Sequence, residues 1–94
     1  MSLPNVLLVS LDTTRADVAY SGKLSNLERL RRGGTTFKKV VSSAPLTPPS
    51  HASIFTGLQP SKHGIRHLLR ERMNDGVPTL ASTLARVRYH RRPA

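Results

Sequence analysis

The chain has 94 residues, which is enough for one small domain and too few for two. It has no cysteine, which excludes a disulfide-stapled domain and a zinc site with cysteine ligands, and its longest apolar run is far shorter than the roughly 20 residues that span a bilayer. The formal net charge is +10, from 15 Lys and Arg against 5 Asp and Glu.

The positive charge increases along the chain. Residues 1–30 are neutral overall, whereas residues 61–94 hold eight basic side chains against two acidic ones. Such a gradient is typical of a basic tail that contacts nucleic acid or an anionic membrane. The alternative is that the last residues were never selected to be part of this protein.

Two segments have the composition of strands. Residues 6–11 form a short apolar run rich in branched side chains, typical of a strand buried on both faces of a parallel sheet, and residues 35–41 predict a second strand. The first strand would deliver Asp12 to its carboxyl end, where ligands gather in open α/β sheets. The alternative is that Asp12 only caps the following turn.

Three segments predict helices: residues 25–32, capped by Ser25 or Asn26, residues 50–56, which end at a glycine, and a last helix from residue 80 with Thr79 as its cap. Residues 59–64 are predicted to be a loop and residues 74–76 a turn, whereas residues 66–73 permit a helix without requiring one.

The start of the middle helix is where chemistry is expected. Proline restricts the residue before it to extended geometry, so Thr47 is predicted at the corner between an extended segment and a helix that begins near Ser50. A helix N-terminus favours a bound anion, and a hydroxyl needs a base or a metal to become a nucleophile. Asp12 is a hard oxygen donor that suits a divalent cation, which could stabilise the Thr47 alkoxide. The alternative is ordinary helix capping by Thr47 and Ser50.

Several strings resemble the sulfatase and alkaline phosphatase superfamily. They are PNVLLVSLDTTRAD at 4–17, the helix-to-strand unit at 26–37, APLTPPSHASIFTGL at 44–58, His-Gly at 63–64 and VPTLA at 77–81. The third string is similar to the sulfatase signature, in which Cys or Ser, one variable residue, Pro, a small residue and Arg precede a helix that ends in Thr-Gly. The resemblance implies an α/β fold, the incomplete N-terminal part of an α/β/α sandwich with a mainly parallel sheet.

The resemblance also implies site residues. Thr47 matches the nucleophile position, which also contacts the metal, and Asp12 matches a metal ligand. Thr13 stands where sulfatases place a second ligating Asp, and His51 replaces the signature Arg, so that it is a candidate to hydrogen-bond the anion or to lie on the helix surface. His63 is expected to be a loop residue near the site without a catalytic role. Threonine cannot yield the formylglycine of true sulfatases, but it is the nucleophile in related phosphotransferases and phosphodiesterases.

The function implied is that of a metal-dependent hydrolase or transferase of sulfate or phosphate esters. Its cofactor would be one divalent ion, Ca, Mn or Mg rather than Zn, and its partner a small anionic ester rather than nucleic acid or a membrane. The alternative is a small basic protein that binds nucleic acid or another polyanion. The motifs outweigh this alternative because the four aromatic residues are spread apart instead of interleaving with the basic ones.

Family members are several times longer, and their remaining metal ligands lie downstream. Residues 1–86 are therefore expected to be the N-terminal segment of a sulfatase-like domain, inactive alone, and residues 87–94 a basic tail produced by a frameshift or premature stop. A genuine short protein is the alternative. An unpaired sheet edge predicts self-association, and the absence of a signal peptide predicts a cytoplasmic location.

Overall fold

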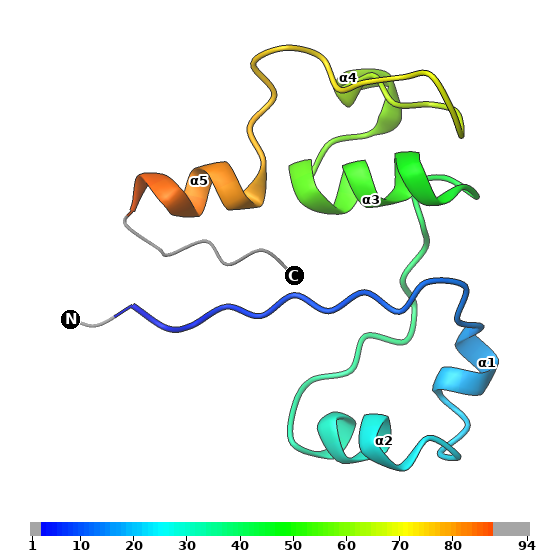
Figure 1. The fold of residues 1–94 in the computed structure, drawn as a ribbon. Helices are drawn as coiled ribbons and strands as arrows, with labels where there is room; N and C mark the ends of the chain where they lie inside the picture. The colour runs from blue at the N-terminus through cyan, green and yellow to red at the C-terminus, as the bar shows by residue number, and fades with distance from the viewer. Residues whose placement is uncertain (1–2, 88–94) are drawn as a thin grey trace. The chain divides into compact units, whose positions relative to one another are not determined.

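The computed structural model describes residues 3–87. The chain divides into two units, Met1–Lys39 and Val40–Ala94. Each unit is described by itself. The described residues contain five helices and no strand (Figure 1). The basic tail predicted at 87–94 lies, apart from Val87, outside the described residues.

The predicted parallel sheet is absent from residues 3–87, so the α/β expectation is wrong for this part of the chain. Residues 6–11 run as an uncoiled trace without a strand partner, and their apolar side chains are exposed, Leu7 by 86% (Figure 1). Residues 35–41 also lack a partner, and Val41 is 90% exposed. The physical reason is that a strand's backbone hydrogen bonds must reach a neighbouring strand, whereas those of a helix close within the segment itself.

The first unit holds two helices, α1 (Ala16–Ala19) and α2 (Ser25–Arg32). The bounds of α2 confirm the predicted helix, but its N-cap is Leu24, and neither Ser25 nor Asn26 caps it with a side chain. An ion pair of Glu28 with Arg31 supports α2, and the hydrogen bond from Arg31 holds the pKa of Glu28 below its usual value.

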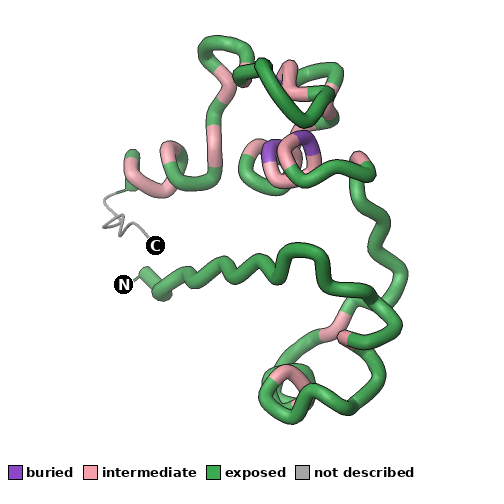
Figure 2. The backbone as a smooth tube through the Cα atoms, turned by 45° about the vertical axis from the view of Figure 1, so that its right-hand side comes forward, coloured by how far each residue is buried: buried purple, intermediate pink, exposed green. Residues whose placement is uncertain are grey.

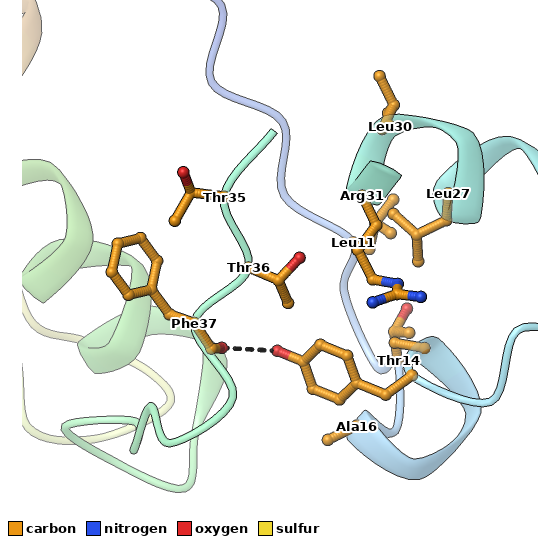
Figure 3. Close-up of a pocket in the computed structure, with 11 residues that line it drawn as sticks. Leu11, Thr14, Ala16, Leu27, Leu30, Arg31, Thr35, Thr36 and Phe37 are labelled. Atoms are coloured by element: carbon orange, nitrogen blue, oxygen red, sulfur yellow. Dashed lines mark hydrogen bonds between the residues drawn. The ribbon is translucent and has the colours of Figure 1, made fainter. Parts of the chain in front are cut away.

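The first unit also has a hollow of about 530 Å³ that is open to solvent (Figure 3). A hydrogen bond of 3.0 Å from the Tyr20 hydroxyl to the carbonyl oxygen of Phe37 connects the end of α1 to the segment after α2. The hollow is lined by Leu11, Thr14, Ala16, Ala19, Tyr20, Leu27, Leu30, Arg31, Thr35, Thr36 and Phe37.

The second unit contains α3 (Thr47–Thr56), α4 (Pro60–His63) and α5 (Leu80–Arg86), and α3 contacts both of the other helices. Within its described part, residues 40–87, the buried residues are Pro49 and Ala52 on α3 and His63 on α4. Figure 2 colours buried positions purple. None of the helices within residues 3–87 has the length and apolar character needed to cross a bilayer.

Helix α5 begins with the cap that the sequence predicts. The hydroxyl of Thr79 accepts the backbone N–H of Ser82 at 3.0 Å, and the Ser82 hydroxyl accepts the Thr79 N–H at 2.9 Å, which completes a capping box. We expect Thr79→Ala to destabilise α5 by about 1 kcal/mol, since the hydrogen bond from the Ser82 N–H depends on this side chain. The measurement is the helical Cα chemical shift of residues 80–86. Thr79→Ser is the control and should keep most of the helicity, so equal losses in both variants would contradict the capping role.

Candidate active site

Thr47 lies where an extended segment becomes α3, at the predicted corner, but the expectation that the following proline holds Thr47 extended is wrong, because Thr47 is helical. Leu46 has extended dihedral angles of φ −118° and ψ 147°, and Thr47 is the first helical residue. The helix therefore starts three residues before the predicted position at Ser50. Pro48 and Pro49 permit this earlier start because the first helical turn needs no backbone N–H, and because the proline ring holds φ near the helical value.

The same two prolines limit the backbone donors at this helix N-terminus. Pro48 and Pro49 have no N–H group, and the Ser50 N–H already donates to the Leu46 carbonyl oxygen at 3.1 Å. An anion at this end would therefore depend on the helix dipole and on side chains more than on a ring of N–H groups. The Ser50 hydroxyl lies 3.0 Å from the hydroxyl of Ser42, which precedes the corner.

His51 shares a face of α3 with Thr47. The two residues are four positions apart, so their side chains are neighbours on consecutive turns. The imidazole of His51 is half-buried and stacks on the ring of Phe55, with 6.0 Å between ring centroids and 20° between ring planes. The structure thus brings the two predicted catalytic residues together on one helix, with His51 oriented by an aromatic neighbour.

Asp12 and Thr13 belong to the first unit and form a tight turn after the apolar segment. A carboxylate oxygen of Asp12 accepts the Thr13 N–H at 2.9 Å, and the Thr14 hydroxyl donates to the Asp12 carbonyl oxygen at 3.4 Å. Thr13 has a φ of 57°, a left-handed conformation that costs a β-branched residue about 1–3 kcal/mol. Backbone strain of this kind clusters at functional sites, and here it falls on a predicted metal-ligand position.

The side chains proposed to hold a metal are hard oxygen donors: the carboxylate of Asp12 and the hydroxyls of Thr13 and Thr47. This donor chemistry fits Ca²⁺, Mg²⁺ or Mn²⁺ better than Zn²⁺, which favours nitrogen and sulfur. Within residues 3–87, no group of three or more His, Cys, Asp and Glu side chains is arranged to hold a metal ion. Thr47 belongs to the second unit, so the structure does not describe its position relative to the Asp12 turn.

Sequence reasoning missed the role of His63, which is fully buried at the end of α4 instead of lying in a loop. Its Nδ1 accepts the Ile65 N–H at 3.1 Å, so Nε2 carries the proton and donates to the Ser53 hydroxyl of α3 at 3.0 Å. With both ring nitrogens in use, His63 connects α3 to α4. The sequence signal that could have indicated this position is the glycine that follows it, Gly64, whose φ is 93°.

A second feature missed from sequence is the carboxylate of Glu71. It accepts hydrogen bonds from the Arg66 N–H, from the His67 N–H at 2.8 Å and from Nδ1 of His67 at 2.7 Å. The bond from the His67 side chain, followed by those from the two backbone N–H groups, lowers the pKa of Glu71 from 4.5 to about 2.

This shift predicts an acid-sensitive loop. A carboxyl group whose pKa is lower in the folded state contributes stability that is present above pH 4.5 and is lost as the pH falls toward 2. We expect the Glu71 side-chain carbonyl resonance to titrate with a midpoint near 2, and the midpoint to rise toward 4.5 in His67→Ala, which removes the largest cause. An unchanged midpoint in His67→Ala would contradict this account.

Comparison with known proteins identifies the family. Residues 6–77 match the family model described as type I phosphodiesterase / nucleotide pyrophosphatase. This segment includes both the Asp12 turn and α3. The chain therefore belongs to this family, within the alkaline phosphatase superfamily, which confirms the resemblance seen in the sequence.

Individual relatives agree with this assignment. The chain is 41% identical over 61 residues to an uncharacterized pyrophosphatase/phosphodiesterase of Schizosaccharomyces pombe, which covers 64% of this chain and 13% of the relative. It is 37% identical over 67 residues to a sulfatase of Formosa agariphila, with 66% and 13% covered. It is 42% identical over 65 residues to human ectonucleotide pyrophosphatase/phosphodiesterase family member 1, with 66% and 7% covered. The matched part thus spans about a tenth of each relative's length, and no solved structure matches.

Proposed function

We propose that this chain carries the nucleophile segment of a metal-dependent hydrolase that acts on phosphodiesters. The observation that supports it most is the family match over 6–77, which includes Thr47 at the first position of α3. Phosphate is favoured over sulfate because a threonine cannot become formylglycine. The names of the S. pombe and human relatives, pyrophosphatase/phosphodiesterase, agree with this preference.

In the proposed reaction, the Oγ1 of Thr47 attacks the phosphorus atom of the diester. The bond from phosphorus to one alcohol oxygen breaks, and that alcohol leaves with the proton that the threonine hydroxyl gives up. Water then attacks the phosphothreonine ester, which restores the Thr47 hydroxyl and releases a phosphate monoester. Two displacements of this kind divide one difficult step into two easier ones.

The remaining residues of the site orient these groups. His51, held against Phe55 on the same face as Thr47, would donate a hydrogen bond to a phosphoryl oxygen. Asp12 would hold a divalent ion, with the hydroxyls of Thr13 and Thr47 as further oxygen donors. When bound, such an ion stabilises an alkoxide and polarises the phosphoryl oxygen.

We also propose that this activity requires groups beyond those in the chain. The relatives carry about nine-tenths of their length outside the matching part, and residues 3–87 hold no group of three acidic or histidine side chains around a metal position. The chain alone would therefore bind a metal weakly and turn over no substrate.

Metal binding tests the Asp12 assignment directly. We expect Mn²⁺ to broaden the amide resonances of Asp12 and Thr13 at lower concentration than the other resonances. Asp12→Asn should raise the Mn²⁺ concentration required for this broadening by at least about tenfold, since it removes the charged donor. Asp17→Asn is the matched control, because Asp17 is an exposed carboxylate nearby that is already paired with Arg15 at 2.8 Å. Equal broadening in both variants would contradict the ligand assignment.

A further inference from the structure

A loop in the second unit combines exposed leucines with positive charge. We call residues 66–72 the basic loop. Its two central residues, Leu68 and Leu69, are 57% and 74% exposed. They are flanked on both sides by exposed basic or imidazole side chains, namely Arg66, His67, Arg70 and Arg72.

The basic loop is closed by its own contacts. The carboxylate of Glu71 accepts the backbone N–H groups of Arg66 and His67 and the imidazole Nδ1 of His67, so the two ends of the loop are connected. The carboxylate of Glu71 is therefore hydrogen-bonded within the loop. Arg70 has a φ of 66°, a conformation that costs a residue other than glycine about 1–3 kcal/mol. The loop thus keeps a strained shape that leaves two leucines facing solvent.

Other exposed apolar residues in the described chain have a different pattern. Residues 6–9 form an uninterrupted apolar run of the kind that a sheet covers, and so their exposure follows from the missing strand partners. Leu68 and Leu69, by contrast, have charged or imidazole neighbours within two positions on either side. That pattern does not suit a strand buried on both faces of a sheet.

We propose that the basic loop binds the surface of an anionic bilayer, with Leu68 and Leu69 inserted among the acyl chains and the arginines against the lipid phosphates. Charge complementarity supports this partner, because each basic side chain near an anionic bilayer strengthens binding by about fivefold. Leucines contribute binding free energy when they enter the acyl region, because their apolar surface leaves water. They contribute none against the phosphate backbone of a nucleic acid, where single-stranded bases are bound by stacking on aromatic side chains. Such a surface contact requires no spanning helix, and it revises the expectation from sequence that no membrane is involved.

Vesicle co-sedimentation of the full chain tests the proposal. We expect binding to phosphatidylcholine vesicles that contain about 30% phosphatidylserine, little binding to phosphatidylcholine alone, and weaker binding as salt shortens the Debye length. The double variant Leu68→Ser/Leu69→Ser should lower the partition coefficient by at least about tenfold, since two leucines leave the bilayer. The double variant Val40→Ser/Val41→Ser is the matched control, because this exposed apolar pair follows two lysines without comparable closure of the segment.

Glu71→Ala separates loop shape from charge. It makes the chain more positive, so attraction alone would strengthen binding to anionic vesicles, whereas loss of the loop closure should weaken it. Weaker binding supports the proposal. The proposal is overturned if the leucine and valine pairs matter equally, if Glu71→Ala binds more strongly, or if single-stranded RNA competes fully with vesicles while the leucine variant binds like the parent.

Discussion

Alanine in place of Thr47 is expected to lower phosphodiester hydrolysis by about a thousandfold or more in a complete enzyme that contains this segment, because it removes the attacking oxygen. The enzyme for this test is a chimera in which the matching part of this chain replaces the corresponding part of human ectonucleotide pyrophosphatase/phosphodiesterase family member 1, to which it is 42% identical over 65 residues. The measurement is kcat/KM for a chromogenic phosphodiester, together with mass spectrometry of quenched enzyme for a phosphate ester on Thr47.

Two variants control for this result. Thr47→Ser keeps the hydroxyl and should retain most of the activity, and it should carry the ester on the serine. Ser50 lies about one turn further along α3, and Ser50→Ala removes a hydroxyl that interacts with Ser42. This variant keeps the nucleophile, so any loss of its activity measures the effect of disturbing the start of the helix. If Thr47→Ala is as active as the parent chimera, or if no ester forms at position 47, the nucleophile assignment is wrong.

The success and failure of the sequence predictions follow from the distance over which each element is stabilised. Helix α2 and the cap of α5 at Thr79 depend on residues within four positions, and the sequence predicts both. The strands predicted at 6–11 and 35–41 depend on partners that residues 3–87 do not provide, so these segments form no regular structure and their apolar side chains remain exposed. Apolar patterning indicates what a segment can bury, and only tertiary contacts decide whether it does.

At the candidate site, too, the features set by neighbouring residues are predictable, and those that depend on distant contacts are not. The corner near Thr47 is predictable because proline suits the first turn of a helix, but the helix includes Thr47 and Pro48, which the following prolines are expected to hold extended. The burial of His63 is not predictable, because it requires the Ser53 hydroxyl ten positions away; Gly64 can indicate where α4 ends, but not that the histidine before it is buried. The left-handed conformation of Thr13 is equally unpredictable, since a β-branched residue rarely adopts it.

The junction after His63 gives the largest stability effect that we expect. Gly64 has a φ of 93°, and a Cβ atom placed on it would lie 2.5 Å from Oδ1 and 2.9 Å from Cγ of Asn74. Asn74 cannot move away at little cost, because its Nδ2 donates to the Lys62 carbonyl oxygen at 2.9 Å and its backbone N–H donates to the His63 carbonyl oxygen at 2.8 Å.

We therefore expect Gly64→Ala to destabilise the second unit by about 2–4 kcal/mol, the sum of left-handed strain and a lost hydrogen bond. Gly57→Ala is the matched control, since Gly57 is also left-handed at φ 71° but a Cβ atom added to it would meet nothing within 4 Å, and the substitution should cost only about 1–2 kcal/mol. The measurement is the hydrogen-exchange protection of the Asn74 N–H. In an Asn74→Ala background, Gly64→Ala should destabilise the second unit no more than Gly57→Ala does, because the clashing side chain is gone. If Gly64→Ala is as destabilising in that background as in the parent chain, its effect comes from backbone strain alone.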